Sequence, residues 1–147
     1  MKLNLGCSSA HHEGFTNVDL CPPADVIADL NGEWPWEDSS IDYILGIDII
    51  EHLTNKINTM NEIWRVLKPE GVAELEVPTT NGECAFADPT HVSFWNSKSF
   101  SYFLVGHPYR CQYAEAYGIR AKFTVVESYT RTMRDGPKLL IKLQAVK

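Results

Sequence analysis

Short apolar runs alternate with polar turns along the first third of the chain. Four such runs, rich in Val, Ile or Leu and bounded by Gly, Pro, Asp or Asn, occupy residues 2–5, 15–19, 24–28 and 41–45. Each run is too short for a typical helix, whereas strands that are buried on both faces of a parallel sheet show this continuous apolar pattern. We therefore predict four buried strands in this part of the chain.

A helical period replaces this pattern between residues 55 and 67. The apolar stripe consists of Ile57, Met60, Ile63, Trp64 and Leu67. This spacing places the stripe on one face of an amphipathic helix. Thr54 is the predicted N-cap, and the Lys-Pro-Glu-Gly sequence at 68–71 ends the helix. Residues 72–77 then predict a fifth strand, in which apolar and acidic residues alternate.

Residues 79–118 differ from the rest of the chain in being rich in aromatic residues, His, Pro and Ser. Their length and composition predict a lid or substrate-binding segment with one short helix at 97–105. Two further strands are predicted at 122–133 and 138–146, around an Arg-Asp-Gly-Pro turn. The second of these strands alternates strongly, as expected for an antiparallel hairpin with one wetter face.

The order of these elements predicts an α/β fold, with an open, mostly parallel sheet that ends in an antiparallel hairpin. The interval between the first two strands leaves room only for a shortened first crossover helix. We find no internal repeat and no interdomain linker, so residues 1–147 are expected to form one domain.

The composition narrows the range of functions. A net charge of −6 and a pI of about 5.3 argue against nonspecific binding of nucleic acids, which requires a basic face. No apolar run reaches membrane-spanning length, and the N-terminus leads directly into a strand, so neither an anchor nor a signal peptide is predicted. We expect a soluble cytoplasmic protein, and a chain this small could form a homodimer to cover apolar surface.

The four cysteines lack the close spacing of paired ligands, and reduced thiols are expected in a domain with this much apolar sequence. One combination, Cys84, His91, His107 and Cys111, has the donor types of a Cys2His2 zinc site. Its spacings are long and irregular, and it contains no Cys-x-x-Cys pair. No metal site is therefore predicted.

Six segments occur in a characteristic order: LNLGC, NVDL, ADL, WPWEDSSIDYI, IIEHL and EIWRVLKPEGVAELEVP. Together they resemble the class I S-adenosylmethionine-dependent methyltransferases, in particular their small methyltransferase-domain branch. The likeness extends from Leu3 to about Pro78, half of the chain. It implies a Rossmann-like, seven-stranded sheet with a reversed last strand, which the predicted C-terminal hairpin fits.

The resemblance implies that S-adenosylmethionine lies beyond the carboxyl ends of the strands. It assigns Asp19 to the ribose hydroxyls, and Asp29, with Leu30 beside it, to the adenine. The methionine end is expected at the end of the fourth strand. The implied cofactor-binding residues are Gly6, Cys7, Ser8, Asp19, Leu20, Asp29, Leu30, Gly46, Ile47 and Asp48.

The glycine loop departs from the family pattern. Where the family has roughly GxGxG, this chain has Gly-Cys-Ser-Ser at residues 6–9. A dinucleotide pyrophosphate needs backbone amides at a helix N-terminus and glycines that allow a close approach, whereas S-adenosylmethionine carries no phosphate. The missing glycines therefore count more against an NAD-dependent oxidoreductase than against a methyltransferase. With so short a crossover, His11 and His12 are candidates to close over the cofactor.

Two histidines are candidates for catalysis. His91 belongs to an Asp-Pro-Thr-His sequence in the aromatic segment, and it could act as a general base because the ordinary pKa of histidine is about 6.5. His52 follows Glu51 at the position where the resemblance implies the start of a helix. Each has a structural alternative. His91 could only form a hydrogen bond within the lid. Glu51 could be an acid that the helix dipole favours at a helix start, with His52 merely its neighbour.

The predicted function is methyl transfer from S-adenosylmethionine to an acceptor that the sequence does not name. The acceptor classes left open are a small molecule, a sugar- or lipid-like compound, and a protein side chain. A base is needed only if the acceptor loses a proton. The alternative function is a noncatalytic binding module that retains the fold. The missing glycines and the short first crossover favour this alternative.

Overall fold

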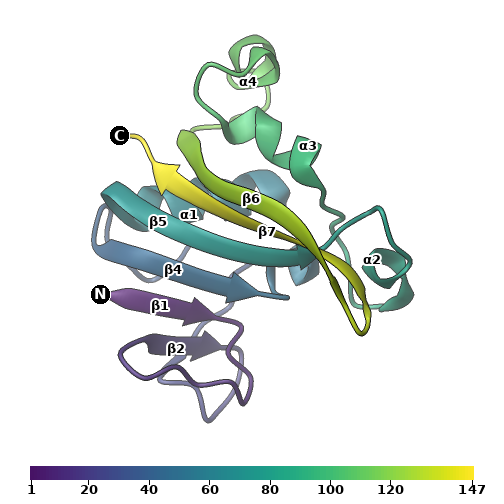
Figure 1. Cartoon of the computed structure of the whole chain (residues 1–147). Coiled ribbons are helices and arrows are strands. Elements are labelled where there is room, and N and C mark those ends of the chain that lie inside the picture. Colours follow the sequence, from purple (N-terminus) through teal and green to yellow (C-terminus); the bar gives the residue numbers. More distant parts are fainter.

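A mixed sheet of seven strands organises the chain, and the computed structural model describes all residues, 1–147. The strands follow in the spatial order β3-β2-β1-β4-β5-β7-β6 (Figure 1). They are β1 (Lys2–Leu5), β2 (Thr16–Asp19), β3 (Val26–Ile27), β4 (Ile41–Ile47), β5 (Leu67–Pro78), β6 (Phe123–Met133) and β7 (Gly136–Ala145). The first five strands are parallel, and β7 runs antiparallel to both β5 and β6. This topology confirms the predicted fold class and its C-terminal hairpin.

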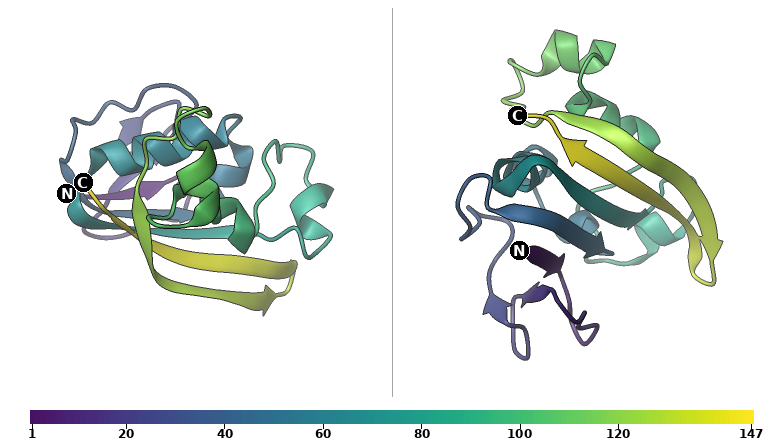
Figure 2. Two further views of the ribbon diagram at one scale, coloured as in Figure 1. Left: turned by 90° about the horizontal axis from the view of Figure 1, so that it is seen from above. Right: turned by 60° about the vertical axis from the view of Figure 1, so that its left-hand side comes forward.

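The helices are short and follow β4 in the chain. They are η1 (Ile50–His52), α1 (Lys56–Val66), α2 (Cys84–Ala87), α3 (Ser97–Phe100), η2 (Ser101–Phe103) and α4 (Pro108–Tyr113). Figure 2 (left) shows α1 and the α3–α4 region on the same face of the sheet. The core on this face includes Met60 and Ile63 of α1, Leu75 of β5 and the buried Trp95 and Phe100. None of the helices has the length and apolar character needed to cross a membrane.

Ion pairs occupy the other face of the central strands. Lys142 Nζ lies 3.3 Å from Glu74 Oε2 and 3.2 Å from Glu127 Oε2. Glu76 pairs with Arg131 of β6. Glu74 and Glu76 alternate along β5 with apolar residues that face the core, because successive side chains of a strand point to opposite faces. The alternating acidic pattern of this strand thus has a direct structural explanation.

The N-cap of α1 is Asn55, so the predicted cap at Thr54 is wrong by one residue. Asn55 Oδ1 accepts hydrogen bonds from the backbone amides of Ile57 and Asn58 at 3.1 and 3.0 Å. Thr54 instead donates its amide and its hydroxyl to Asn31 Oδ1, at 2.9 and 3.0 Å. The helix itself is confirmed, and it gives way to β5 without an intervening loop.

The connection between β1 and β2 contains no helix at all, which goes beyond the predicted shortening of the first crossover. Two buried asparagines hold this loop. Asn4 Nδ2 donates to the Ala10 carbonyl at 2.8 Å and to Asn17 Oδ1 at 2.9 Å. Asn17 Oδ1 also accepts from the amide of His12 at 3.0 Å. Side-chain amides therefore satisfy backbone groups that a helix would otherwise pair internally.

Residues 79–118 divide into a buried and an exposed part. Trp95, Phe100 and Phe103 are buried in the main core, and the helix predicted at 97–105 is present as α3 followed by η2. Phe86 and Phe94 are exposed and stack on each other, with ring centroids 4.9 Å apart. The buried aromatic residues of this segment thus serve as scaffold, and none of its Phe, Tyr or Trp residues lines the two cavities described below.

Candidate active site

A cavity of about 100 Å³ lies at the carboxyl ends of the N-terminal strands, where the strand order reverses between β1 and β4. We call it the switch-point cavity. It is lined by Gly6, Asp19, Leu20, Ala28, Asp29, Leu30, Asn31, Ile49, His52 and Leu53. Open α/β sheets bind their ligands at this position. The lining includes half of the cofactor-binding residues implied by the resemblance: Gly6, Asp19, Leu20, Asp29 and Leu30.

Gly6 is required by local packing. Its φ is +64°, and a Cβ added there would lie 2.7 Å from the Ile49 Cδ1 atom. The space that the missing side chain leaves is thus filled by Ile49, which itself lines the cavity. Glycine at this position allows the chain after β4 to pack against the end of β1.

Asp19 holds the loop that follows β1. Its Oδ2 accepts a hydrogen bond from the Ser8 amide at 2.8 Å, and its Oδ1 accepts from the Leu20 amide at 2.7 Å. Asp29 is arranged in a similar way, because its Oδ1 accepts from the amide and the side chain of Asn31. These hydrogen bonds lower the pKa of Asp29, so it is ionised at neutral pH.

The other implied cofactor residues lie elsewhere. The Cys7 side chain is buried, and this burial raises the pKa of its thiol. Ser8 lies beside Asp19 on a neighbouring cavity. Gly46 packs under Leu75 and Ile49, and Ile47 is exposed. Asp48 lines a second, larger cavity. Asn31 was not predicted from the sequence, and only its position two residues after Asp29 could have indicated it.

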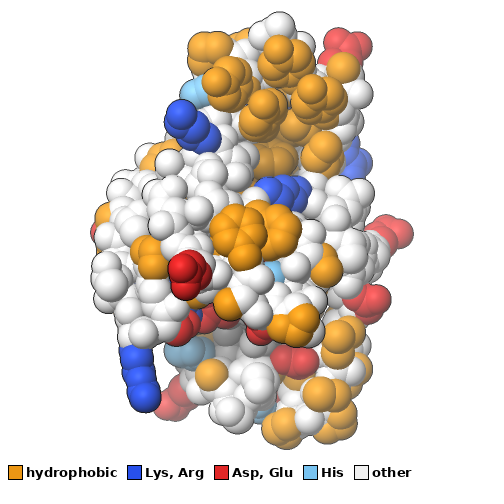
Figure 3. All heavy atoms as spheres, turned by 90° about the vertical axis from the view of Figure 1, so that its right-hand side faces the viewer, with side chains coloured by type: hydrophobic (Ala, Val, Ile, Leu, Met, Phe, Trp, Pro, Cys, Tyr) orange, Lys and Arg blue, Asp and Glu red, His pale blue; other side chains and the backbone are white.

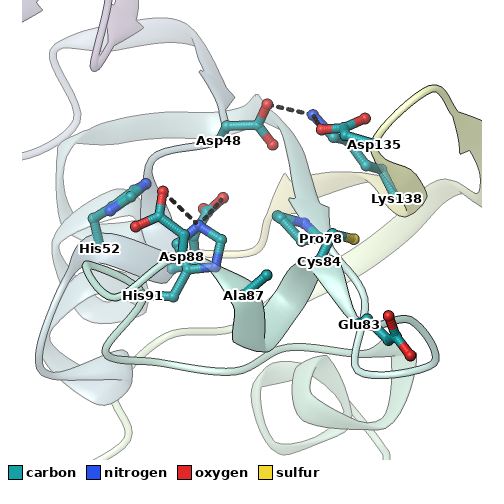
Figure 4. A pocket seen from close by; sticks show the side chains of 11 residues that line it. Asp48, His52, Pro78, Glu83, Cys84, Ala87, Asp88, His91, Asp135 and Lys138 are labelled. Atoms are coloured by element: carbon teal, nitrogen blue, oxygen red, sulfur yellow. Dashed lines mark hydrogen bonds and ion pairs between the residues drawn. The ribbon is translucent and has the colours of Figure 1, made fainter.

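The second cavity has a volume of about 490 Å³, and most of the residues that line it are polar or charged (Figure 4). We call it the acidic cavity. It is lined by Asp48, Glu51, His52, Pro78, Glu83, Cys84, Ala87, Asp88, His91, Asp135 and Lys138. These residues come from the ends of β4 and β5, from η1, from α2 and the segment after it, and from the β6–β7 hairpin. His52 lines both cavities, so the two adjoin.

This edge of the molecule faces the viewer in Figure 3. Hydrophobic side chains gather over α4 in the upper part of the view, whereas most of the acidic and histidine side chains lie lower down. The exposed aromatic residues of the chain include Tyr109 of α4 and Tyr117, which follows that helix in the sequence. The polar cavity and the apolar patch therefore occupy different parts of the same face.

Glu51 is the most deeply buried acid of the acidic cavity, with 2% of its surface exposed. Neither of its carboxylate oxygens has a hydrogen-bond partner. Burial, with a further contribution from Asp48, raises the pKa of Glu51 to about 7. Its backbone carbonyl accepts hydrogen bonds from the amides of Val92 and Ser93, at 3.0 and 2.9 Å. These bonds bring the loop that carries His91 against η1.

His91 lies between two carboxylates. Its Nε2 is 4.0 Å from Glu51 Oε1 and 3.9 Å from Asp88 Oδ2, and its Nδ1 is 3.0 Å from the Ala85 carbonyl oxygen. The ring packs edge-on against His52, with centroids 4.8 Å apart. The structure thus brings together the two histidines that the sequence singled out.

The Asp-Pro-Thr-His sequence forms a local hydrogen-bonded turn. Thr90 donates from its hydroxyl to Asp88 Oδ1 at 2.6 Å and from its amide at 2.8 Å. These bonds lower the pKa of Asp88. His52 Nδ1 lies 3.1 Å from Thr90 Oγ1. Thr90 therefore links the Asp88 turn to η1.

Lys138 closes the far side of the acidic cavity. Its Nζ lies 2.6 Å from Asp48 Oδ2 and 3.2 Å from Asp135 Oδ2. Although burial opposes its charge, the hydrogen bonds to these two acids raise the pKa of Lys138. Neither Lys138 nor Asp135 was predicted as a site residue. Both belong to the hairpin, and the sequence contains no motif that connects this hairpin with the residues after β4.

The residues of the zinc combination considered above are not brought together. Cys84 and His91 both line the acidic cavity, but His107 is the N-cap of α4 and Cys111 lies within that helix. The cluster of potential metal-ligating side chains that the structure does form consists of Glu51, His52 and His91.

Comparisons with known proteins agree with this architecture. The sequence model of a family described as "Methyltransferase domain" matches residues 6–75. No curated protein matches the sequence significantly. A SAM-dependent methyltransferase from Methanosarcina mazei superimposes with a TM-score of 0.68 at 14% identity, and the match covers 99% of this chain and 92% of that chain.

Two further solved structures have the same fold. The 1,6-didemethyltoxoflavin-N1-methyltransferase of Burkholderia thailandensis, solved with 1,6-didemethyltoxoflavin and S-adenosylhomocysteine, gives a TM-score of 0.67 at 13% identity. That match covers 99% of this chain and 71% of that chain. A chain from the complex of the Haloferax volcanii Trm112 methyltransferase activator with its methyltransferase partner gives 0.67 at 16% identity, covering 99% and 82%. The family match over residues 6–75 and the shared sheet architecture confirm the resemblance to the class I S-adenosylmethionine-dependent methyltransferases.

Proposed function

We propose that the protein transfers a methyl group from S-adenosylmethionine, bound at the switch-point cavity, to an acceptor bound in the acidic cavity. The observation that carries this proposal is the position of His52, which lines both cavities. Methyl transfer requires donor and acceptor sites that meet at one point, because the acceptor atom, the methyl carbon and the sulfur must lie in line. Two separate, distant cavities would not meet this requirement.

The reaction itself makes modest demands on the protein. A lone pair of the acceptor atom forms the bond to the methyl carbon, the carbon–sulfur bond breaks, and its electron pair remains on sulfur as S-adenosylhomocysteine forms. Alignment of the two reactants supplies up to about 7–11 kcal/mol in favourable cases. An oxygen or amine acceptor also has to release a proton, and Glu51, His52 and His91 form the wall of the acidic cavity at which it would be released.

In this proposal the cofactor residues have the roles that the resemblance implies. Asp19 would accept hydrogen bonds from the ribose hydroxyls, and Asp29 and Leu30 would contact the adenine. Asp19 and Asp29 are both oriented by hydrogen bonds from backbone amides, which leave further lone pairs of each carboxylate free to accept. Such preorganisation lowers the entropy cost of binding.

The lining of the acidic cavity favours a polar acceptor. It contains the carboxyl groups of Asp48, Glu51, Glu83, Asp88 and Asp135, against the single lysine Lys138. Because Lys138 is already paired with two of these acids, the cavity retains a negative balance. Hydroxyl- or amine-bearing small molecules and side chains fit this chemistry better than a lipid-like acceptor does.

Calorimetric titration with S-adenosylhomocysteine tests the proposal. The wild-type chain should bind with one site per chain, and Asp19→Ala should bind at least about tenfold more weakly. Glu37→Ala is the matched control, since Glu37 is an exposed acid that precedes β4 and lines neither cavity. Absence of binding by the wild-type chain would contradict the proposal. Binding that Asp19→Ala leaves unchanged would move the cofactor away from this cavity.

A noncatalytic module remains the second candidate, and one observation favours it. Both oxygens of Asp19 are already engaged by backbone amides, so the carboxylate has a structural role without any cofactor. One neighbouring fold is known from a complex with a methyltransferase activator, and a partner protein would suit such a module here as well. This function predicts that no acceptor is methylated when radiolabelled S-adenosylmethionine is supplied with a panel of hydroxyl and amine compounds.

A further inference from the structure

We propose that Glu51, His52 and His91 bind a divalent transition-metal ion at the wall of the acidic cavity. Each of these residues offers one potential ligand atom, and the three atoms lie within 4.8 Å of one another. The binding of the ion can be measured by itself, whereas its role in methyl transfer rests on the proposed function.

The first argument is the distance between donor atoms. Two donors bound at about 2.1 Å to a tetrahedral zinc ion lie about 3.4 Å apart. His91 Nε2 lies 4.0 Å from Glu51 Oε1 and 3.9 Å from Asp88 Oδ2. These separations are slightly longer than the coordinated distance and too long for direct hydrogen bonds. An ion between the side chains would draw them together by a small rotation of each.

The second argument is the state of Glu51. Both of its oxygens are buried without a hydrogen-bond partner, and its side chain lines the acidic cavity. A buried carboxylate without partners is costly, and native proteins normally supply a hydrogen-bond donor or a metal ion to such a group. No other residue of this chain donates a hydrogen bond to the carboxyl oxygens of Glu51, so a ligand in the cavity would supply the partner that they lack.

The third argument is the orientation of the histidines. The Ala85 carbonyl accepts from His91 Nδ1, which leaves the His91 Nε2 lone pair free toward the carboxylates. Thr90 Oγ1 has given its hydrogen to Asp88, so it accepts from His52 Nδ1 and leaves His52 Nε2 free. Histidines that ligate metals typically donate their other ring nitrogen to a carbonyl or a similar acceptor in this way.

The donor set indicates the class of ion. Two imidazoles and a carboxylate suit zinc, cobalt, iron or nickel, whereas magnesium and calcium prefer ligands made of oxygen alone. Asp88 is a fourth potential ligand at the open side of the cluster. An ion here would bind an acceptor hydroxyl as a Lewis acid, lower its pKa and release its proton to solvent. The oxygen left behind would be the nucleophile for the methyl group.

The test uses cobalt(II) as the probe, after removal of metal with a chelator. The wild-type chain should bind one cobalt ion and develop the visible absorption bands of a site with nitrogen and oxygen ligands. Glu51→Gln and His91→Gln should each weaken binding at least about tenfold. Two matched controls should bind as the wild type does: Glu83→Gln, an acid of the same cavity outside the cluster, and His107→Gln on α4.

The outcomes are distinguishable from those of the proposed function. Absence of stoichiometric cobalt binding, or binding that persists in both Glu51→Gln and His91→Gln, would overturn the metal site. Methyl transfer that continues in chelator would then leave His91 as a free base and the proposed function intact. Cobalt binding without S-adenosylhomocysteine binding would support the metal site and contradict the proposed function. If one variant fails to fold, as judged by its thermal unfolding, the other variant decides the outcome.

Discussion

Asp19 and Ser8 are joined by a hydrogen bond that turns the chain back over the end of β1: the Ser8 amide donates to Asp19 Oδ2 at 2.8 Å. The same carboxylate is the proposed partner of the cofactor ribose. The Asp19 side chain would thus both hold the loop after β1 in the absence of a ligand and bind the cofactor when it is present. Substitution by alanine alone cannot separate these two roles.

Asp19→Asn should separate them. The asparagine oxygen can still accept from the Ser8 amide, so we expect a loss of stability of only about 1 kcal/mol. The affinity for S-adenosylhomocysteine should fall at least about tenfold, because an amide offers one acceptor oxygen where the carboxylate offers two. Chemical denaturation and calorimetry on the same samples measure the two effects. Equal affinity in Asp19→Asn and wild type would exclude the proposed ribose contact.

Gly6→Ala should be strongly destabilising. The added Cβ would meet Ile49 at 2.7 Å in a backbone with φ of +64°, so strain and overlap add together. We expect a loss of about 2–4 kcal/mol in the free energy of unfolding. Gly14→Ala is the matched control, since Gly14 has φ of +77° with nothing within 4 Å of the added atom.

The Gly14→Ala control measures the cost of backbone strain without any steric contact of the added Cβ. Gly14→Ala should cost about 1 kcal/mol, from conformational strain alone. Comparable losses in the two variants, measured by urea denaturation, would show that contact with Ile49 contributes little. The close packing of the chain after β4 onto β1 would then not explain why this single glycine is needed.

The strands, the helix at α1 and the C-terminal hairpin could be predicted from the sequence because each has its own local pattern. The resemblance motifs also led to the residues of the switch-point cavity. The acidic cavity could not be predicted as a unit. Its residues come from five separate parts of the chain, and the Val92 and Ser93 amides that join two of them bind a backbone carbonyl. Hydrogen bonds between backbone groups do not depend on side-chain type, so the sequence pattern does not indicate them.

The structural role of Asn61 could not be predicted for a similar reason. It lies within the predicted helix as an ordinary polar residue, but it is buried and binds the chain that leads into β6. Its Oδ1 accepts from the amides of Arg120 and Ala121 at 2.8 and 3.0 Å, and its Nδ2 donates to the Gly118 carbonyl at 2.9 Å. Only the tertiary structure shows that these groups depend on one side chain.

Asn61→Ala should therefore cost about 2–4 kcal/mol, because it leaves buried backbone groups without partners. Asn58→Ala on the same helix is the control. Asn58 donates only two longer hydrogen bonds, at 3.3 and 3.2 Å, to the carbonyls of Asn31 and Gly32. Its loss should cost about 1 kcal/mol or less. Equal costs of the two variants in thermal denaturation would contradict the assigned role of Asn61.

The buried Glu51 makes stability depend on pH in the metal-free chain. Burial raises its pKa from an ordinary 4.5 to about 7, so the folded state binds a proton that the unfolded state has already released. Its contribution is fully present below about pH 4.5 and is lost as the pH rises to about 7. Of the neighbouring charges, Asp48 and Asp88 raise this pKa, and Lys138 lowers it.

In the presence of a chelator, the wild-type chain should therefore lose stability between pH 5 and pH 8 relative to Glu51→Gln, by about 2–3 kcal/mol. Glutamine has the same shape but does not titrate, so the difference between the two chains isolates this one carboxyl group. Asp88→Asn, at the exposed side of the same cavity, should change the difference only slightly. A difference that stays constant with pH, or that grows in the opposite direction, would show that Glu51 is ionised in the folded chain. An ionised Glu51 would in turn require a cation to remain beside it even in chelator.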